Sequence, residues 1–175
     1  QKTIGGSGSD WLTTIIESSD GGYFVAGYSG SPVSGEKTED VVGGMDYWVL
    51  KLDVTGAIEW QNSIGGASID ELSFASPTAD NGIICGGSSS SGISGDKSEA
   101  SRGGKDYWIV KIDSTGSLEW DKTFGGSADD FLASIVQTPD GGFICGGSSK
   151  SGISGDKTET GRGFDDYWIL KLDTV

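Results

Sequence analysis

The sequence predicts an all-β protein built from three copies of one unit, and three observations support this prediction. A 60-residue pattern recurs in register along the whole chain, over residues 1–60, 61–120 and 121–175. Each copy contains short β-branched and aromatic segments separated by turns rich in Gly and Asp. No segment has the 3.6-residue periodicity of an amphipathic helix. We therefore expect one structural domain of three repeats, in which the third repeat has an incomplete last strand.

Four strands are expected in each copy, and the first copy shows the reasons. Asp20-Gly21-Gly22 predicts a tight hairpin, because glycine accepts the positive φ that such turns require. Gly27 falls inside a predicted strand and indicates a close backbone approach. Gly56 predicts a second turn. The expected strands of the first copy cover residues 11–18, 23–29, 46–52 and 57–63.

The third strand of each copy decides the architecture. Its sequence in the first copy, DYWVLKL at 46–52, is apolar on both faces, whereas a sheet with one solvated face shows strict alternation. Sheets covered on both sides within an all-β repeat predict four-stranded antiparallel blades that stack as in a β-propeller. A β-trefoil is the alternative, because it also has three units of four strands. Closed propellers have about 4 to 8 blades, so we expect further blades of the same array or a second copy of the chain to complete the structure.

The composition disfavours several functions. The net charge of −14 argues against nucleic acid and anionic lipid as partners. No apolar run approaches the ~18 residues of a membrane-spanning helix, so membrane insertion is not expected. The chain has no His, which removes Ser-His-Asp and Cys-His catalytic groups. Carboxylate pairs leave glycoside hydrolysis open, but they recur with the repeat, as residues of a scaffold do. We expect a protein that is not an enzyme.

The two cysteines occupy one position of the repeat. Cys85 and Cys145 lie 60 residues apart, and Val25 stands at the same place in the first copy. Equivalent positions of neighbouring blades are too far apart for the ~5.5 Å Cα separation of a disulfide. We therefore expect both side chains to be small buried hydrophobic groups.

The long loop at 31–45 and its equivalents offer candidate sites. These loops and the links such as GGSGSD at 5–10 should share one rim of the blades, with the hairpin turns on the other. Long loops on a rigid scaffold frequently carry binding sites, so a protein or glycan partner is expected at this rim. Oxygen-rich side chains there make calcium a possible ligand, with no other cofactor expected. The candidate ligands are Asp10, Asp70, Asp130, Asp96, Glu99, Asp156 and Glu159.

A structural interpretation of the same residues stays open. An Asp before the first strand can accept hydrogen bonds from the preceding glycine-rich turn. The Lys and Glu of the long loops can form surface ion pairs worth under ~1 kcal/mol each. Among the aromatic residues, the tryptophans of the DYW segments should pack between blades. Trp11 is the best candidate for an exposed, ligand-binding aromatic residue, since Glu71 and Phe131 replace it in the other copies.

The repeat resembles a known family of propeller repeats. The matching segments are GGSGSD at 5–10, DGGYFVAGYS at 20–29, DYWVLKLDVTGAIEWQNSIGG at 46–66, DYWIVKIDSTGSLEW at 106–120 and DGGFICGGSS at 140–149. They are similar to the seven-bladed propeller (SBBP) repeat and to the delta-60 repeats of secreted bacterial proteins. The resemblance implies a propeller fold and an extracellular or cell-surface location. It also implies an origin in Bacteroidota and export by the type IX system.

Two function hypotheses follow. The first is a structural spacer or a protein-binding, adhesive platform in a secreted protein. The second is a carbohydrate-binding module that uses the long-loop rim, with or without calcium. An enzyme of the glycoside hydrolase type is the least favoured hypothesis.

Overall fold

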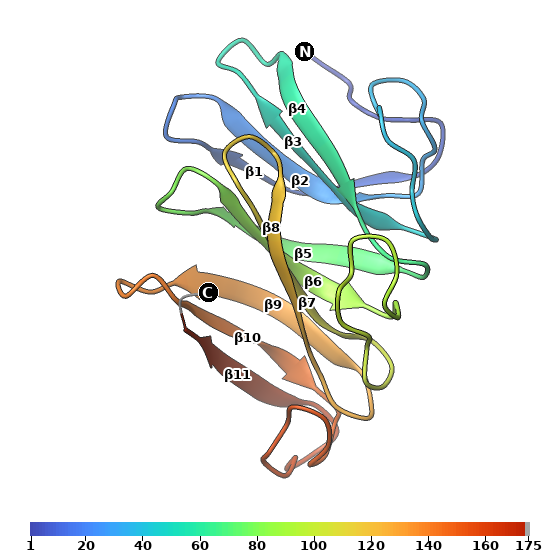
Figure 1. Cartoon of the computed structure of the whole chain (residues 1–175), viewed down its shortest axis with the longest axis vertical. Coiled ribbons are helices and arrows are strands. Elements are labelled where there is room, and N and C mark those ends of the chain that lie inside the picture. The colour runs from blue at the N-terminus through green and yellow to red at the C-terminus, as the bar shows by residue number, and fades with distance from the viewer. Residues whose placement is uncertain (174–175) are drawn as a thin grey trace.

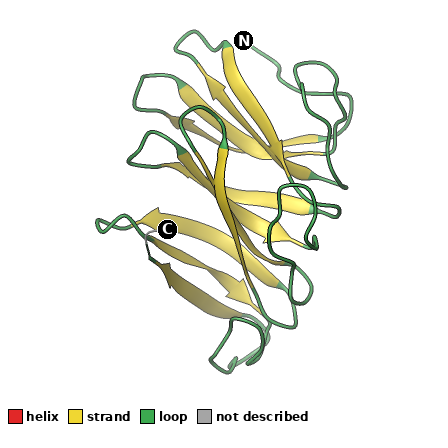
Figure 2. Cartoon of the chain, viewed as in Figure 1, coloured by secondary structure: helices red, strands yellow, loops and turns green. Residues whose placement is uncertain are grey.

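The computed structural model describes residues 1–173, which form eleven strands and no helix (Figures 1 and 2). The strands belong to three sheets that lie one behind another along the long axis of the molecule (Figure 1). The bounds are β1 Asp10–Glu17, β2 Tyr23–Ser29, β3 Asp46–Leu52, β4 Ile58–Ile64, β5 Asp70–Pro77, β6 Ile83–Ser89, β7 Asp106–Ile112, β8 Leu118–Phe124, β9 Asp130–Gln137, β10 Phe143–Ser149 and β11 Asp166–Leu172.

Each repeat forms its own antiparallel sheet of consecutive strands. We call β1–β4 sheet 1, β5–β8 sheet 2 and β9–β11 sheet 3. The predicted second and third strands of the first copy are confirmed to the residue, and the first and fourth are displaced by one residue. Among the described residues, the one isolated β-bridge between two sheets joins Met45, before β3, to Ile69, before β5. Three separate sheets differ from the shared barrel that a β-trefoil would need.

The turns have the predicted conformation. Gly21 and Gly56 both have φ of +83°, where a residue with a side chain would be strained. The amide of Gly21 donates to the carbonyl of Ser18 at 3.0 Å, and the amide of Gly56 donates to that of Asp53 at 3.0 Å. These bonds close the two hairpins that reverse the chain within sheet 1.

The backbone of β1 passes close to Gly27, as the position of this glycine inside a strand predicts. A Cβ atom there would lie 1.9 Å from the carbonyl oxygen of Trp11. The β1–β2 register shifts between Leu12 and Thr14, so the strand β1 bulges against the glycine. Gly87 occupies the same place in sheet 2, where a Cβ would lie 1.9 Å from the carbonyl of Glu71.

The core lies between the sheets. All seven residues of β3 and all seven of β7 are buried, as the apolar pattern on both faces of these strands predicts. The ring of Tyr47 packs on Trp108 of the next sheet at 4.8 Å, and Tyr107 packs on Trp168 at 5.1 Å. The predicted packing between repeats is therefore confirmed for Trp108 and Trp168. It is wrong for Trp48, which packs with Leu50 and Leu52 of its own sheet.

The loops divide between two rims as predicted. The loops that follow β2, β6 and β10 lie on one side of the stack, and the short hairpin turns lie on the other (Figure 1). Both cysteines are free and buried, as expected. Within residues 1–173 there is no helix long and apolar enough to cross a membrane.

Candidate functional site

The long loops fold in the same way in all three repeats. Each closes on itself by a backbone bridge between its Ser and its Lys, and each has a Gly at φ +56° between them; the bridges are Ser34–Lys37, Ser94–Lys97 and Ser154–Lys157. The serine hydroxyl also accepts a hydrogen bond from the amide of the link that enters the sheet, as between Ser7 and Ser34 at 2.8 Å. The rim is thus a built structure rather than a set of free loops.

Two of the predicted calcium ligands hold this rim together. In sheet 2 the Asp96 amide donates to the Gly65 carbonyl at 2.9 Å, and the Gly65 amide donates to Asp96 Oδ2 at 3.1 Å. Asp156 and Gly125 repeat this reciprocal pair at 2.9 and 3.0 Å. In both residues one carboxylate oxygen therefore accepts a hydrogen bond from the backbone, as the structural interpretation of the sequence predicts.

Asp10, Asp70 and Asp130 bind the glycine-rich links. Their Oδ2 atoms accept from the amides of Gly6, Gly66 and Gly126 at 2.8, 2.7 and 2.7 Å. The three residues begin the first strands of three different sheets, so the fold does not bring them together. Among residues 1–173 no three acidic, cysteine or histidine side chains are grouped so as to hold a metal ion.

The lysine of each long loop corrects the sequence analysis. We expected it to form an exposed ion pair, but Lys37, Lys97 and Lys157 are 2, 1 and 4 % exposed. Lys97 Nζ lies 5.1 Å from the centre of the Trp108 ring and donates to the hydroxyl of Thr123 in β8. Burial lowers the pKa of Lys97 to about 8. Lys37 and Lys97 therefore bind their loops to the fourth strand of the sheet instead of pairing on the surface.

The glutamates of the long loops also bind the fourth strand in two of the sheets. Glu39 accepts from the Ser63 amide at 2.6 Å, and Glu99 accepts from the Thr123 amide at 3.1 Å. The equivalent residue of sheet 3, Glu159, is exposed. By comparison with Glu39 and Glu99, Glu159 is positioned to accept a hydrogen bond from the backbone N–H of an adjacent strand.

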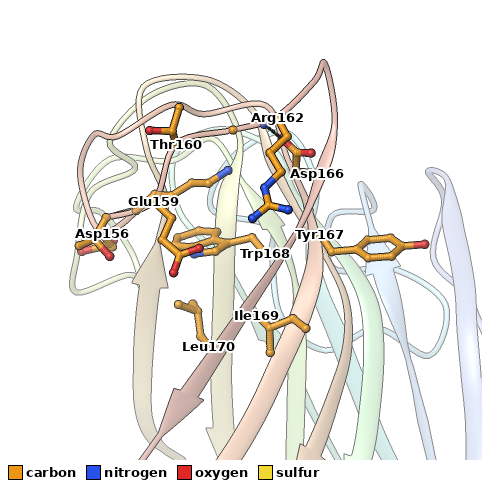
Figure 3. Close-up of a pocket in the computed structure, with 12 residues that line it drawn as sticks. Asp156, Glu159, Thr160, Arg162, Asp166, Tyr167, Trp168, Ile169 and Leu170 are labelled. Carbon is orange, nitrogen blue, oxygen red and sulfur yellow. Dashed lines mark hydrogen bonds between the residues drawn. The ribbon is translucent and has the colours of Figure 1, made fainter.

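Sheet 3 has an open groove where the other sheets have their fourth strand (Figure 3). The groove is lined by residues 156–162 of the long loop and residues 166–170 of β11. Glu159 and Trp168 both border the groove, while the Tyr167 side chain points away from them (Figure 3). The lining carries the buried cation of Lys157, the guanidinium of Arg162, the edge of β11 and three carboxylates, those of Asp156, Glu159 and Asp166.

The polar residues that line this groove are equivalent to those that bind β4 in sheet 1 and β8 in sheet 2. Trp48 Nε1 donates to Gln61 Oε1 at 3.0 Å, and Trp108 Nε1 donates to Asp121 Oδ2 at 2.9 Å. Trp168 is the equivalent residue of β11. Lys157 Nζ donates to Ser149 at 2.8 Å, whereas its counterpart in sheet 2 reaches a hydroxyl of β8.

Trp11 is exposed, as expected, at 56 %. Its ring stacks on that of Tyr28, with centroids 6.4 Å apart and planes 16° from parallel. The pair lies on the face of sheet 1 that turns toward sheet 2, and both residues border a cavity that also includes Leu12 and Ile15 of the opposite face. Its role in ligand binding stays a prediction.

Sequence reasoning singled out Asp70 and Asp130, but not the buried aspartates that lie near them in the preceding sheets. Asp46 and Asp106 begin β3 and β7, are fully buried, and each has one oxygen, Oδ1, without a hydrogen-bond partner. Asp70 and Asp130 of the next sheets share both properties and lie close enough to raise the pKa of their neighbours. Burial, with these charges, raises the pKa of Asp46 and Asp106 to about 6. The recurrence of Asp directly before Tyr-Trp was the one sequence feature that could have indicated these buried aspartates.

Comparison of the chain with protein-family models gives no match, and comparison with curated proteins gives none either.

Proposed function

We propose that this chain is a non-catalytic, protein-binding repeat module whose sheets are blades of the propeller type. In this proposal the module is secreted or displayed on a cell surface, in line with the repeats that its sequence resembles. The observation that carries the proposal is the open groove of sheet 3. It repeats the side chains that bind a fourth strand in sheets 1 and 2, and it faces the edge of β11.

An exposed strand edge with such a lining favours an extended polypeptide as ligand. Main-chain hydrogen bonds to the edge supply affinity, and side-chain pockets along it supply selectivity. Two positions of the ligand are specified by the lining. A carboxylate or amide oxygen should accept from Trp168 Nε1, as in Gln61 and Asp121, and a hydroxyl two residues later should meet Lys157, as in Thr123.

A peptide that reproduces β8 provides the test. The nine residues 118–126, LEWDKTFGG, carry a fluorescent label, and binding to the full chain is followed by anisotropy in dilute solution. We expect saturable binding that weakens at least about tenfold, or by about 1.4 kcal/mol, when the equivalents of Asp121 and Thr123 are both alanine. Equal binding of the two peptides, or no binding of either, contradicts the proposal.

A matched pair of protein variants assigns the binding to the groove. Glu159→Gln removes the charge that should receive a strand N–H, and Glu119→Gln changes a carboxylate on the outer side of β8, where it pairs with Lys111 at 2.7 Å. The first variant should bind the peptide more weakly, and the second should bind it as the unaltered chain does.

The stacked pair of Trp11 and Tyr28 is the observation that favours the carbohydrate-binding alternative, because flat aromatic pairs accept sugar rings. A glycan array with and without calcium tests it. Binding that is lost in Trp11→Ala, while the β8 peptide still binds, would favour this second function.

A further inference from the structure

The contact between successive sheets is the same at both places where it occurs. Tyr47 Oη donates to the carbonyl of Trp108 at 3.0 Å, and Tyr107 Oη donates to the carbonyl of Trp168 at 3.2 Å. Thr13 and Ser73 likewise donate to the carbonyls of the next sheet, at 2.9 and 2.6 Å. Each repeat therefore carries two different surfaces, one that contacts the following sheet and one that contacts the preceding sheet.

Sheet 3 exposes the first side of that contact. Tyr167 is 93 % exposed and Ile169 is 66 % exposed, although their counterparts in sheets 1 and 2 are completely buried. These two side chains border an apolar depression with Val136 and Ile144, which we call the outer face of sheet 3. It presents the residues with which sheets 1 and 2 each bind their successor.

Sheet 1 exposes the second side. Leu12 is 62 % exposed, whereas Leu72 and Leu132 at the same position are 2 and 3 % exposed. Ile15 is 59 % exposed, and its counterpart Ile135 is 2 % exposed. The outer face of sheet 1, made of Leu12 and Ile15 with Val25 and Trp48, is therefore the surface that receives the preceding sheet. The two exposed faces of one chain complement each other.

Residues 1–4 supply what the open groove of sheet 3 specifies. They read Gln-Lys-Thr-Ile and align with Gln-Asn-Ser-Ile at the end of β4 and with Asp-Lys-Thr-Phe at the end of β8. Gln1 stands where Gln61 accepts from a tryptophan indole, and Thr3 stands where Thr123 accepts from a buried lysine. The order and spacing of these two side chains match the groove.

These residues already lie against sheet 1 as β4 lies against sheet 2. Lys2 Nζ donates to the Gly56 carbonyl at 2.7 Å, and Asn62 Nδ2 at the equivalent position donates to the Gly116 carbonyl at 2.8 Å. Ile4 packs beside Trp48 in the core cluster of sheet 1. A sheet placed on the outer face of sheet 1 would find residues 1–4 at its own edge, in the place of its fourth strand.

We propose that the outer face of sheet 3 binds the outer face of sheet 1 of a second copy of this chain, and that residues 1–4 of that copy fill the open groove as the fourth strand of sheet 3. The register follows from β3 and β4, in which Tyr47 pairs with Ile64 and Leu50 with Gln61. Ile4 then pairs with Tyr167, and Gln1 pairs with Leu170. This proposal rests on the strand-binding function of the groove and names its partner.

Charge gives the association a distinctive salt dependence. Each chain carries a net charge of −14, so two copies repel at long range. The contact itself is mainly apolar, but it includes two charged pairs. Arg102 Nε lies 3.0 Å from Asp156 Oδ2 between sheets 2 and 3, which places Arg162 beside Glu36 of the second copy. The like-charged Asp106 and Asp130 correspond to Asp166 and Asp10 of the second copy, and their repulsion is also weakened by salt. Added salt screens the repulsion more than it weakens the contact, so association should strengthen with salt.

Sedimentation equilibrium of the full chain tests the proposal, from about 1 to about 100 µM and at about 0.05 and 0.5 M NaCl. We expect a mass that rises with concentration to two chains, with tighter association at the higher salt. A growing series of multiples would support the same contact repeated without closure of a ring. A monomer under all of these conditions would overturn the proposal.

Two surface variants identify the contact. Leu12→Lys and Tyr167→Asp each change a side chain that is exposed in the single copy, so both should fold, as circular dichroism will check. Each alone should weaken self-association at least tenfold, whereas Ile93→Lys, at a 72 % exposed loop position, should not. A mixture of Leu12→Lys with Tyr167→Asp should form dimers again, because one contact in the mixed pair is unaltered.

The mixing experiment separates this contact from other modes of association. A symmetrical contact that uses one face on both copies would not be restored by mixing, and that result would overturn the head-to-tail arrangement. If the β8 peptide binds the groove while the chain remains monomeric, the strand-binding function stands and the second copy is excluded as its partner. If neither occurs, the proposed function itself is wrong.

Discussion

Replacement of Asp106 by asparagine should stabilise the fold at neutral pH and destabilise it in acid. Asp106 is fully buried at the start of β7, and burial, together with the charge of Asp130, raises its pKa from 3.8 to about 6. Each pKa unit corresponds to about 1.4 kcal/mol, so the ionised carboxylate costs about 3 kcal/mol at pH 7. The backbone N–H of Arg102 donates to its Oδ2, a bond that an amide oxygen can also accept.

The sign of the pH dependence follows from the direction of this shift. Between about pH 4 and pH 6 the folded chain holds this proton more tightly than the unfolded chain, so the contribution of Asp106 to stability falls as the pH rises. Above pH 6 the cost is constant. Asparagine avoids that cost but buries an amide N–H₂, which costs about 1–3 kcal/mol if it stays unpaired. We expect a net gain of up to about 2 kcal/mol above pH 7 and a loss of about 1–3 kcal/mol below pH 4.

Urea unfolding followed by tryptophan fluorescence, in dilute protein between pH 4 and 8, measures the effect. Asp166 is the matched control, because it begins β11 at the same repeat position but lies at the uncovered sheet. The backbone N–H groups of Arg162 and Gly163 donate to it and hold its pKa below the ordinary value. Asp166→Asn should therefore lose stability at neutral pH. A uniform loss for Asp106→Asn at every pH would refute burial of the charge as the origin.

Three further predictions concern the scaffold and the rim. Gly87→Ala should cost about 1–3 kcal/mol or more in urea unfolding, because its Cβ would meet a carbonyl oxygen, whereas Gly92→Ala, which has open space, should change little; equal effects would contradict the close approach. Millimolar calcium should leave the melting temperature unchanged, since the rim carboxylates bind backbone amides; a rise that a chelator reverses would restore the calcium hypothesis. Cys85 and Cys145 should not react with a thiol reagent at pH 8 until the chain unfolds, because burial raises both pKa values; rapid labelling of the native chain would contradict their burial.

Local features of the fold were readable from the sequence because they depend on residues next to each other. Gly21 and Gly56 mark turns that need positive φ, and the doubly apolar strand at 46–52 indicates a sheet covered on both faces. The strands of the second and third repeats could then be predicted from those of the first, because the three repeats are in register. The position of the rims followed from the alternation of antiparallel strands.

The features that the sequence did not reveal depend on contacts between distant residues. Lys37 resembles a surface lysine in its polar loop, and only the folded loop places it over Trp48 and against Ser63 of β4. The buried pair of Asp46 and Asp70 is likewise formed by residues of two different sheets. The open groove could be identified as a strand-binding site only by comparing equivalent residues in the structure. Glu39 and Glu99 accept hydrogen bonds from a fourth strand, and Glu159 occupies the same position in sheet 3.

Amide hydrogen exchange along β11 tests the central claim, that the groove of sheet 3 binds a fourth strand. In the full chain at high concentration, we expect the β11 amides that face the groove to exchange slowly, as those of β3 and β7 should at any concentration. Dilution, or removal of residues 1–4, should make these β11 amides exchange fast. Exchange along β11 that does not change with concentration, with the β8 peptide or with removal of residues 1–4 would contradict the account.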